Sequence, residues 1–96
     1  MIKLLKVYES PVLGKKLRAE FDIDGRIKHT DFGATGYDDY TIHKDTERRE
    51  RYRIRHKKDL KTMDPIRPGF LSYYLLWGPS SNLAANIRRY KQLFNL

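Results

Sequence analysis

The chain has 96 residues, which suffice for one domain, residues 1–96, with a single modest core but not for two. Twenty Lys and Arg against twelve Asp and Glu give a formal net charge of +8, which favours an anionic partner such as nucleic acid or an acidic protein surface. The absence of Cys excludes disulfides and thiolate metal sites. No apolar run approaches the roughly 20 residues of a membrane span, and the first residues lack a cleavable signal pattern, so a soluble protein is expected.

The first third of the chain predicts three strands. Met1–Tyr8 has β-branched and aromatic side chains typical of a strand, although their alternation slips at Leu4-Leu5. Lys16–Ile23 alternates cleanly between apolar and polar residues. Asp24-Gly25 follows at once and predicts a type I′ turn, in which both central residues need positive φ. Arg26–Phe32 is therefore the returning strand of a hairpin.

The returning strand carries one irregularity. Its apolar residues Ile27 and Phe32 have opposite parity, so they cannot share a face of a regular strand. This predicts a bulge, or places Phe32 beyond the end of the strand. A loop of small and turn-forming residues follows, from Gly33 to Tyr40.

A strongly basic segment, His43–Lys58, comes next. Its sixteen residues hold eight Lys or Arg against three acids, with no Pro or Gly. The segment predicts a helix with Asp39 or Thr41 as its N-cap. Its only apolar side chains are Tyr52 and Ile54, too few for a buried stripe. Most of this helix should therefore face water or a partner.

The charges of the basic segment are ordered along it. Asp45 and Glu47 fall in the first turn and cations fall in the last, as the helix dipole favours. Asp45 with Arg49 and Glu47 with Arg51 form i,i+4 pairs in the favourable orientation.

The last third of the chain predicts two more helices. Two X-Pro pairs interrupt the chain between Asp59 and Pro68. Pro68 suits the first position of a helix that runs to Trp77 and is ended by Gly78-Pro79. Ser80 or Ser81 then caps a final helix with one apolar face. The residues of that face are Leu83, Ile87, Tyr90 and Phe94.

These elements predict an α+β fold. A small antiparallel sheet of about three strands is followed by the basic helix and two C-terminal helices. We expect the two C-terminal helices to cover one face of the sheet, with the basic helix across an edge or end.

The basic helix is the first candidate site. A solvated charged helix is the simpler interpretation, but five unbalanced positive charges favour an anion-binding surface. Arg presents a planar fork of donors that suits phosphate. The candidate residues are Arg48, Arg49, Arg51, Arg53, Arg55, His56, Lys57 and Lys58.

Two aromatic groups are weaker candidates. Tyr37 and Tyr40 precede the basic helix and would stack on unpaired bases, although tyrosines at such places are more often packing residues. The predicted helix after Pro68 has no polar face, so part of it is expected to meet another protein or a second copy of this chain. Its candidate interface residues are Phe70, Tyr73, Tyr74 and Trp77.

Catalytic chemistry has the least support. Histidines and aspartates could in principle assemble a metal-dependent nuclease or an acid–base pair. They are His29, His43, His56, Asp31, Asp38, Asp39 and Asp45. None has a recognised catalytic or metal-binding spacing, so we assign no catalytic residue, metal or cofactor.

Nine short segments in the central and C-terminal parts of the chain form a distinctive pattern. They are Asp31–Ala34, Gly36-Tyr37, Asp39–Thr41, His43–Asp45, Arg51-Tyr52, Arg55–Lys57, Asp64-Pro65, Gly69–Ser72 and Leu75–Trp77. In these segments the chain resembles a family of small basic proteins encoded by large DNA viruses of algae and protists. The resemblance implies a viral origin and a structural or nucleic-acid-associated role, and it transfers no catalytic residue.

Charge and resemblance together predict a non-enzymatic component of a virion, either a minor capsid protein or a core-associated protein. Its partner would be a viral capsid or core protein, or the packaged nucleic acid. The alternative is a sequence-independent nucleic-acid-binding protein in the cytoplasm or nucleus of the infected cell. A small nuclease is a distant third.

Overall fold

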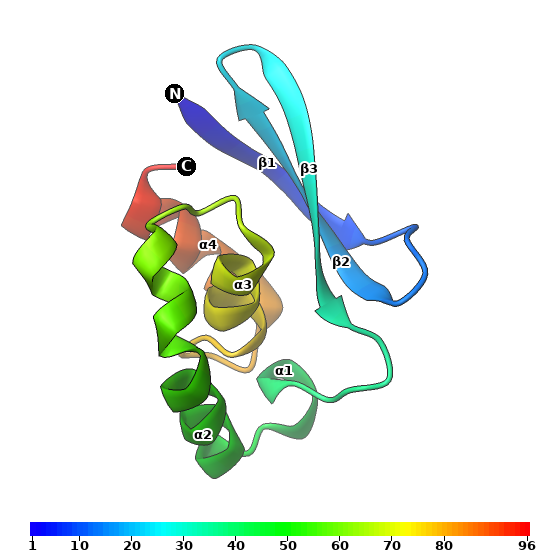
Figure 1. Cartoon of the computed structure of the whole chain (residues 1–96), viewed down its shortest axis with the longest axis vertical. Coiled ribbons are helices and arrows are strands. Elements are labelled where there is room, and N and C mark those ends of the chain that lie inside the picture. Colours follow the sequence, from blue (N-terminus) through cyan, green and yellow to red (C-terminus); the bar gives the residue numbers. More distant parts are fainter.

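The computed structural model describes residues 1–96 and has the predicted α+β architecture (Figure 1). The strands β1 (Ile2–Glu9), β2 (Lys15–Ile23) and β3 (Arg26–Ala34) form one antiparallel sheet in the order β1-β2-β3. The helical elements that follow are α1 (Tyr40–His43), α2 (Thr46–His56), the 3₁₀ helix η1 (Lys57–Thr62), α3 (Pro68–Leu71), the π-helical η2 (Ser72–Leu76) and α4 (Leu83–Phe94).

The β2–β3 hairpin turns at Asp24-Gly25 as predicted. Ile23 pairs with Arg26 across a two-residue loop. Asp24 has φ +52° and Gly25 has φ +88°, so both central residues lie in the positive-φ region that a type I′ turn requires.

Gly25→Val is expected to lower the free energy of unfolding by about 1 kcal/mol or more, because a β-branched residue is forced to positive φ. Nothing lies within 4 Å of a Cβ built on Gly25, so the loss would come from the backbone alone. Urea denaturation measures it. Arg26→Val, at an exposed strand position beside the turn, is the control and should leave the midpoint nearly unchanged. Equal midpoints for both variants would contradict the type I′ turn.

Two strand irregularities were expected, and only the first is present. The register of β1 against β2 shifts between Leu4 and Lys6, which confirms the slip at Leu4-Leu5. The bulge predicted in β3 is wrong, because β3 pairs with β2 in one register throughout and Phe32 lies within the strand, opposite Leu17. The opposite parity of Ile27 has a simpler cause: this side chain points to the other face and is 56% exposed.

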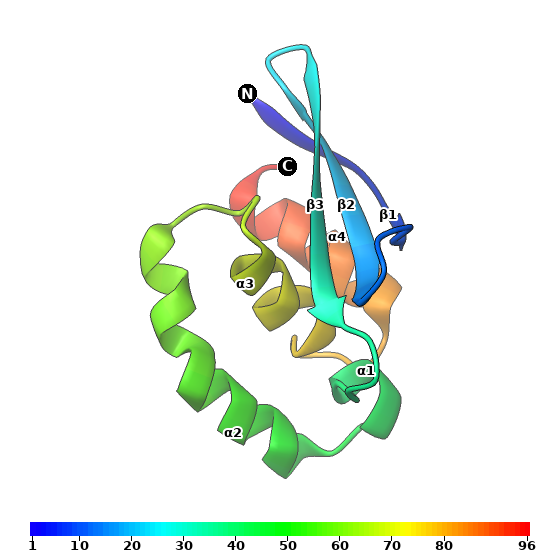
Figure 2. The same cartoon turned by 45° about the vertical axis from the view of Figure 1, so that its right-hand side comes forward.

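One face of the sheet carries the core. Ala19, Phe21 and Phe32 are fully buried there and pack with Leu71 and Leu75 of the α3–η2 segment. All helices lie on this side of the sheet (Figures 1 and 2).

The other face of the sheet is open and polar, and Arg18 and Asp31 form an ion pair on it. Arg18 donates from Nε and NH2 to Asp31, at 2.9 and 3.2 Å, and Ser10 donates to the same carboxylate at 2.6 Å. The Arg18 guanidinium and the Ser10 hydroxyl hold the pKa of Asp31 below its usual value. Arg18 is therefore not free to bind an anion, whereas Lys3 and Lys6 on the same face have no ion-pair partner.

The C-terminal helices begin and end partly as predicted. Pro68 is the first residue of α3, which continues without a break into η2. The final helix is capped by Asn82, whose side chain accepts from the Ala85 N–H at 3.0 Å, so the prediction of Ser80 or Ser81 is wrong. Asn lies among the best N-caps, and the helix simply begins one residue later than expected.

The basic segment is not one helix. Lys44 adopts a left-handed conformation with φ +57° and separates α1 from α2. Asp39 caps the short α1, and Asp45 caps α2 by accepting from the N–H groups of Glu47 and Arg48. The prediction of Asp39 or Thr41 as the cap of the basic helix was therefore wrong.

The helix α2 packs on the α3–η2 segment, on the side away from the sheet, rather than across a sheet edge (Figure 2). None of the helices combines the length and apolar character needed to cross a lipid bilayer.

Candidate functional site

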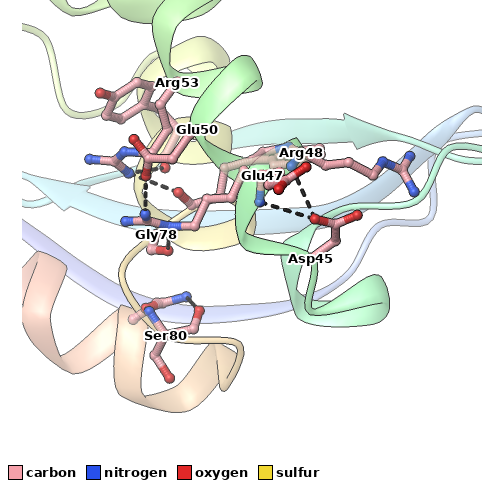
Figure 3. A network of polar contacts seen from close by, with 11 residues as sticks. Asp45, Glu47, Arg48, Glu50, Arg53, Gly78 and Ser80 are labelled. Atoms are coloured by element: carbon pink, nitrogen blue, oxygen red, sulfur yellow. Dashed lines mark hydrogen bonds and ion pairs between the residues drawn. The ribbon is translucent and has the colours of Figure 1, made fainter.

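One side of α2 attaches it to the rest of the molecule. Arg49, Tyr52, Arg53 and His56 follow the i, i+3, i+4, i+7 spacing of a single helix face. Arg49 donates from Nε to the Gly78 carbonyl at 2.6 Å, and Arg53 donates from NH1 to the Trp77 carbonyl at 2.8 Å (Figure 3). These two arginines thus reach the carbonyl groups at the C-terminal end of η2, which the helix itself leaves without partners.

Arg53 is partly buried, unlike the exposed arginines of the same helix. Its guanidinium carbon lies 4.1 Å from the centroid of the Tyr73 ring, and NH1 is also 3.4 Å from the Tyr73 carbonyl. Burial lowers the pKa of Arg53, although a guanidinium stays charged in proteins. Arg49 and Arg53, both predicted to bind an anionic partner, are therefore structural. Their charge offsets the negative end of a helix.

The aromatic residue of this face, Tyr52, packs between α2 and the residue that follows η2. Tyr52 stacks on Trp77, with centroids 4.2 Å apart and ring planes at 7°, and on His56, with centroids 4.1 Å apart. Burial raises the pKa of Tyr52 to about 12. His56 also contacts Asp59, with Nδ1 3.1 Å from Oδ2. Its ring therefore packs on Tyr52 and makes a polar contact with Asp59.

Most of the residues expected to form a protein interface on the helix after Pro68 are not accessible to a partner. Phe70, Tyr73 and Trp77 are buried, and Tyr74 is half-buried against Phe70 and Tyr90. The expectation failed because this segment is enclosed on three sides, by the sheet, by α4 and by α2.

The remaining cations of the basic segment point outward. Arg48, Arg51 and Arg55 have the i, i+3, i+7 spacing of one face, and Lys58 continues it into η1. We call these four residues the cation stripe. All four are exposed, and only Arg51 has an ion-pair partner, Glu47 at 4.0 Å, with 64% of the Arg51 side chain accessible. Lys57 is exposed beside the stripe.

The second predicted pair, Asp45 with Arg49, is not formed. The Asp45 carboxylate accepts the backbone N–H groups that begin α2, and these bonds hold its pKa below the usual value. Arg49 turns inward to Gly78 and pairs with the neighbouring Glu50 instead, at 2.5 Å.

A cleft lies beside the cation stripe, between α2 and the end of β3. Its volume is about 570 Å³. Arg48 and Arg55 from the stripe and Lys15 from β2 line it, together with the apolar side chains of Phe32 and Trp77. A smaller hollow of about 330 Å³ adjoins Arg48, Arg51 and Arg55 on α2. Cations and rings therefore meet at one place on the surface.

Two carboxylates in the cleft already have side-chain partners. Lys16 donates from Nζ to Asp39 at 2.6 Å, where the Asp39 side chain is 3% exposed, and Asp59 contacts His56. Asp38 also lines the cleft but is exposed and has no ion-pair partner. Apart from Asp59, whose partner is a histidine, the charges of the cleft without a side-chain partner are three cations and one carboxylate.

The two tyrosines predicted to stack on bases differ in accessibility. Tyr37 is 74% exposed and lines the cleft. Tyr40 packs against the core, with the Arg49 guanidinium 5.5 Å from its ring centroid. Only Tyr37 therefore presents a free ring.

The histidines considered for catalysis do not come together. His29 is exposed on the open face of the sheet, whereas His43 lies 5.2 Å from Trp77 between ring centroids. His43 accepts the Asp45 N–H on Nδ1, and its Nε2 is buried without a partner. No group of three or more His, Cys, Asp or Glu side chains is placed to hold a metal ion.

Residues 5–56 match a family of unknown function, DUF5754. The match covers more than half of the chain. The chain belongs to this family. In this DUF5754 protein the matched segment contains most of the sheet and ends with the last residue of α2, so it includes the cap at Asp45 and the three arginines of the stripe. No curated protein and no solved structure matches the chain. The resemblance to viral proteins stays a prediction.

Proposed function

We propose that this chain is a non-enzymatic protein that binds the phosphate backbone of nucleic acids through the cation stripe, without sequence preference. The observation that carries the proposal is the division of the arginines on α2. Arg49 and Arg53 are used by the fold, whereas the cation stripe is exposed and has a single ion pair, at 4.0 Å. A small domain with a net charge of +8 keeps these charges free, which suits an anionic partner.

The spacing of the stripe suits a phosphate backbone. With a rise of about 1.5 Å per residue, Arg48 and Arg55 are about 10 Å apart along the helix axis. Duplex DNA carries one phosphate per about 3.4 Å of axis on each strand, so the stripe spans several phosphates. Contacts to the phosphate backbone fix the position of a protein on the nucleic acid without reading the base sequence.

The direct test compares the wild type with a variant in which Arg48, Arg51, Arg55 and Lys58 are replaced by Gln. Fluorescence anisotropy with labelled DNA should show affinity falling at least about tenfold at physiological salt. The slope of log K against log salt should shrink by about 0.9 for each phosphate that the variant no longer neutralises. Stability should change little, because exposed ion pairs contribute about 0–1 kcal/mol each.

A charge-matched control separates a local contact from general attraction. The control variant also loses four positive charges, but from exposed positions outside α2. In it, Gln replaces Lys3, Lys28, Arg88 and Lys91. This variant should retain most of the affinity and slope. Equal losses in both variants would overturn the stripe as the contact, as would unfolding of the stripe variant. Recovered DNA should be intact in all mixtures containing Mg²⁺, and cleavage would contradict a non-enzymatic role.

The setting in a virion rests on the resemblance alone. Mass spectrometry of purified particles, with and without removal of the capsid, tests it by locating the protein in the shell or the core. A saturable complex with an acidic capsid protein, with which duplex DNA does not compete, would favour a protein partner instead.

A further inference from the structure

We propose that the cleft between α2 and the end of β3 holds an unpaired nucleotide of the bound nucleic acid. The inference rests on the proposed function and assigns its substrate class, single-stranded rather than duplex nucleic acid. The volume of the cleft, about 570 Å³, lies within the range of pockets that enclose small organic ligands.

The lining of the cleft suits a ligand with one anionic part and one apolar part. Arg48 and Arg55 belong to the cation stripe and line the cleft as well, so a phosphate bound to the stripe would lie beside its entrance. The buried side chains of Phe32, Leu76 and Trp77 provide an apolar lining, and the ring of Tyr37 is exposed at the same place. A nucleotide combines these two characters, with its phosphate next to a flat base.

The charge balance favours a nucleotide over an acidic peptide. Lys16 is paired with Asp39 and His56 contacts Asp59, but Asp38 remains a carboxylate without an ion-pair partner. This carboxylate would repel the acidic side chains of a peptide in the cleft, whereas the base that a nucleotide would place there is neutral and its phosphate would lie outside, at the stripe. The exocyclic amino groups and ring N–H groups of bases donate hydrogen bonds, and Asp accepts such bonds from bases.

The same geometry favours single strands. A base within a duplex must be unpaired and unstacked before it enters a pocket, whereas a single strand offers its bases at no such cost. Binding through the stripe alone would not distinguish the two forms, because both present phosphates.

The test uses the full-length protein with a short labelled oligothymidylate, an abasic oligomer of equal length and charge, and a duplex. The oligothymidylate is expected to bind at least about tenfold more tightly than the abasic oligomer. Trp77 is the single tryptophan and lines the cleft, so its fluorescence should change with the base-bearing oligomer only.

A variant that fills the cleft with a larger side chain tests whether the preference for the base-bearing oligomer arises there. Ala34 is exposed at the end of β3 and lines the cleft, so Ala34→Phe should abolish most of the preference for the oligothymidylate while retaining binding to duplex. Ala84→Phe, at an exposed position on α4 outside the cleft, is the matched control and should behave as the wild type.

Equal affinity of the wild type for the base-bearing and abasic oligomers would overturn the cleft proposal and leave the proposed function standing, and this comparison needs no variant. Absence of salt-dependent binding to any of the three nucleic acids would overturn both. Polyglutamate that alters Trp77 fluorescence, when oligothymidylate does not, would assign the cleft to an acidic protein instead.

Discussion

Gly78→Ala is expected to lower the free energy of unfolding by about 3 kcal/mol, among the larger effects of a single methyl group. A Cβ at this position would overlap the Tyr74 carbonyl oxygen and would lie 2.9 Å from the side chain of Asn86. A backbone carbonyl within a helical segment cannot rotate away, so the loop at Gly78 would have to move away from η2 and from Asn86 of α4. The Gly78 carbonyl also accepts from Arg49, so the docking of α2 would be disturbed as well.

Guanidinium denaturation measures the loss, with Ser81→Ala in the same loop as control. Ser81 is half-buried, and its hydroxyl makes no hydrogen bond, so this variant should remain close to the wild type. A Gly78→Ala protein with an unchanged midpoint would show that the loop does not approach η2 this closely.

Arg53→Met is expected to lower the free energy of unfolding by about 2–3 kcal/mol, because a hydrogen bond from a charged donor is removed and buried carbonyls are left without partners. Methionine keeps most of the aliphatic packing, so the change in stability reports the guanidinium and its contact with the Tyr73 ring. Chemical denaturation gives the value.

The matched control is Arg55→Met, two residues further along the same helix but exposed. Its unfolding free energy should stay within about 0.5 kcal/mol of the wild type, as for most surface substitutions. If both variants lose equal stability, the division of α2 into structural and free arginines is wrong.

Local sequence signals predicted the sheet well. The Asp24-Gly25 pair and the alternation of β2 depend on neighbours in the chain, as does the apolar face of α4. The shift in β1 was also visible, because two adjacent leucines cannot both face the core of a regular strand.

The docking of α2 was not predictable in this way. Its inward face has ordinary helical spacing but consists of Arg49, Tyr52, Arg53 and His56, so an apolar pattern was missing. The arginines are inward because the distant η2 ends in free carbonyls, which no property of the basic segment reveals. The burial of Trp77 beneath Tyr52 follows from the same contact.

Other features depend on distant partners too. Asn86 is fully buried on α4, donates to the carbonyls of Leu75 and Ser80, and accepts from the Ser80 N–H. In the sequence it is an ordinary polar residue between apolar ones. The contribution of Lys15 to the cleft similarly arises only when the sheet pairs Lys15 with Ala34 at the end of β3.

The division of the arginines on α2 is tested most directly by NMR of the arginine Nε–Hε groups during titration with DNA. We predict that the signals of Arg48, Arg51 and Arg55 shift progressively, because these side chains are free to contact phosphate. The signals of Arg49 and Arg53 should stay nearly constant, since the carbonyls of Gly78 and Trp77 already bind these side chains. Shifts concentrated on Arg49 and Arg53, or on Arg88 and Arg89 of α4, would contradict the account.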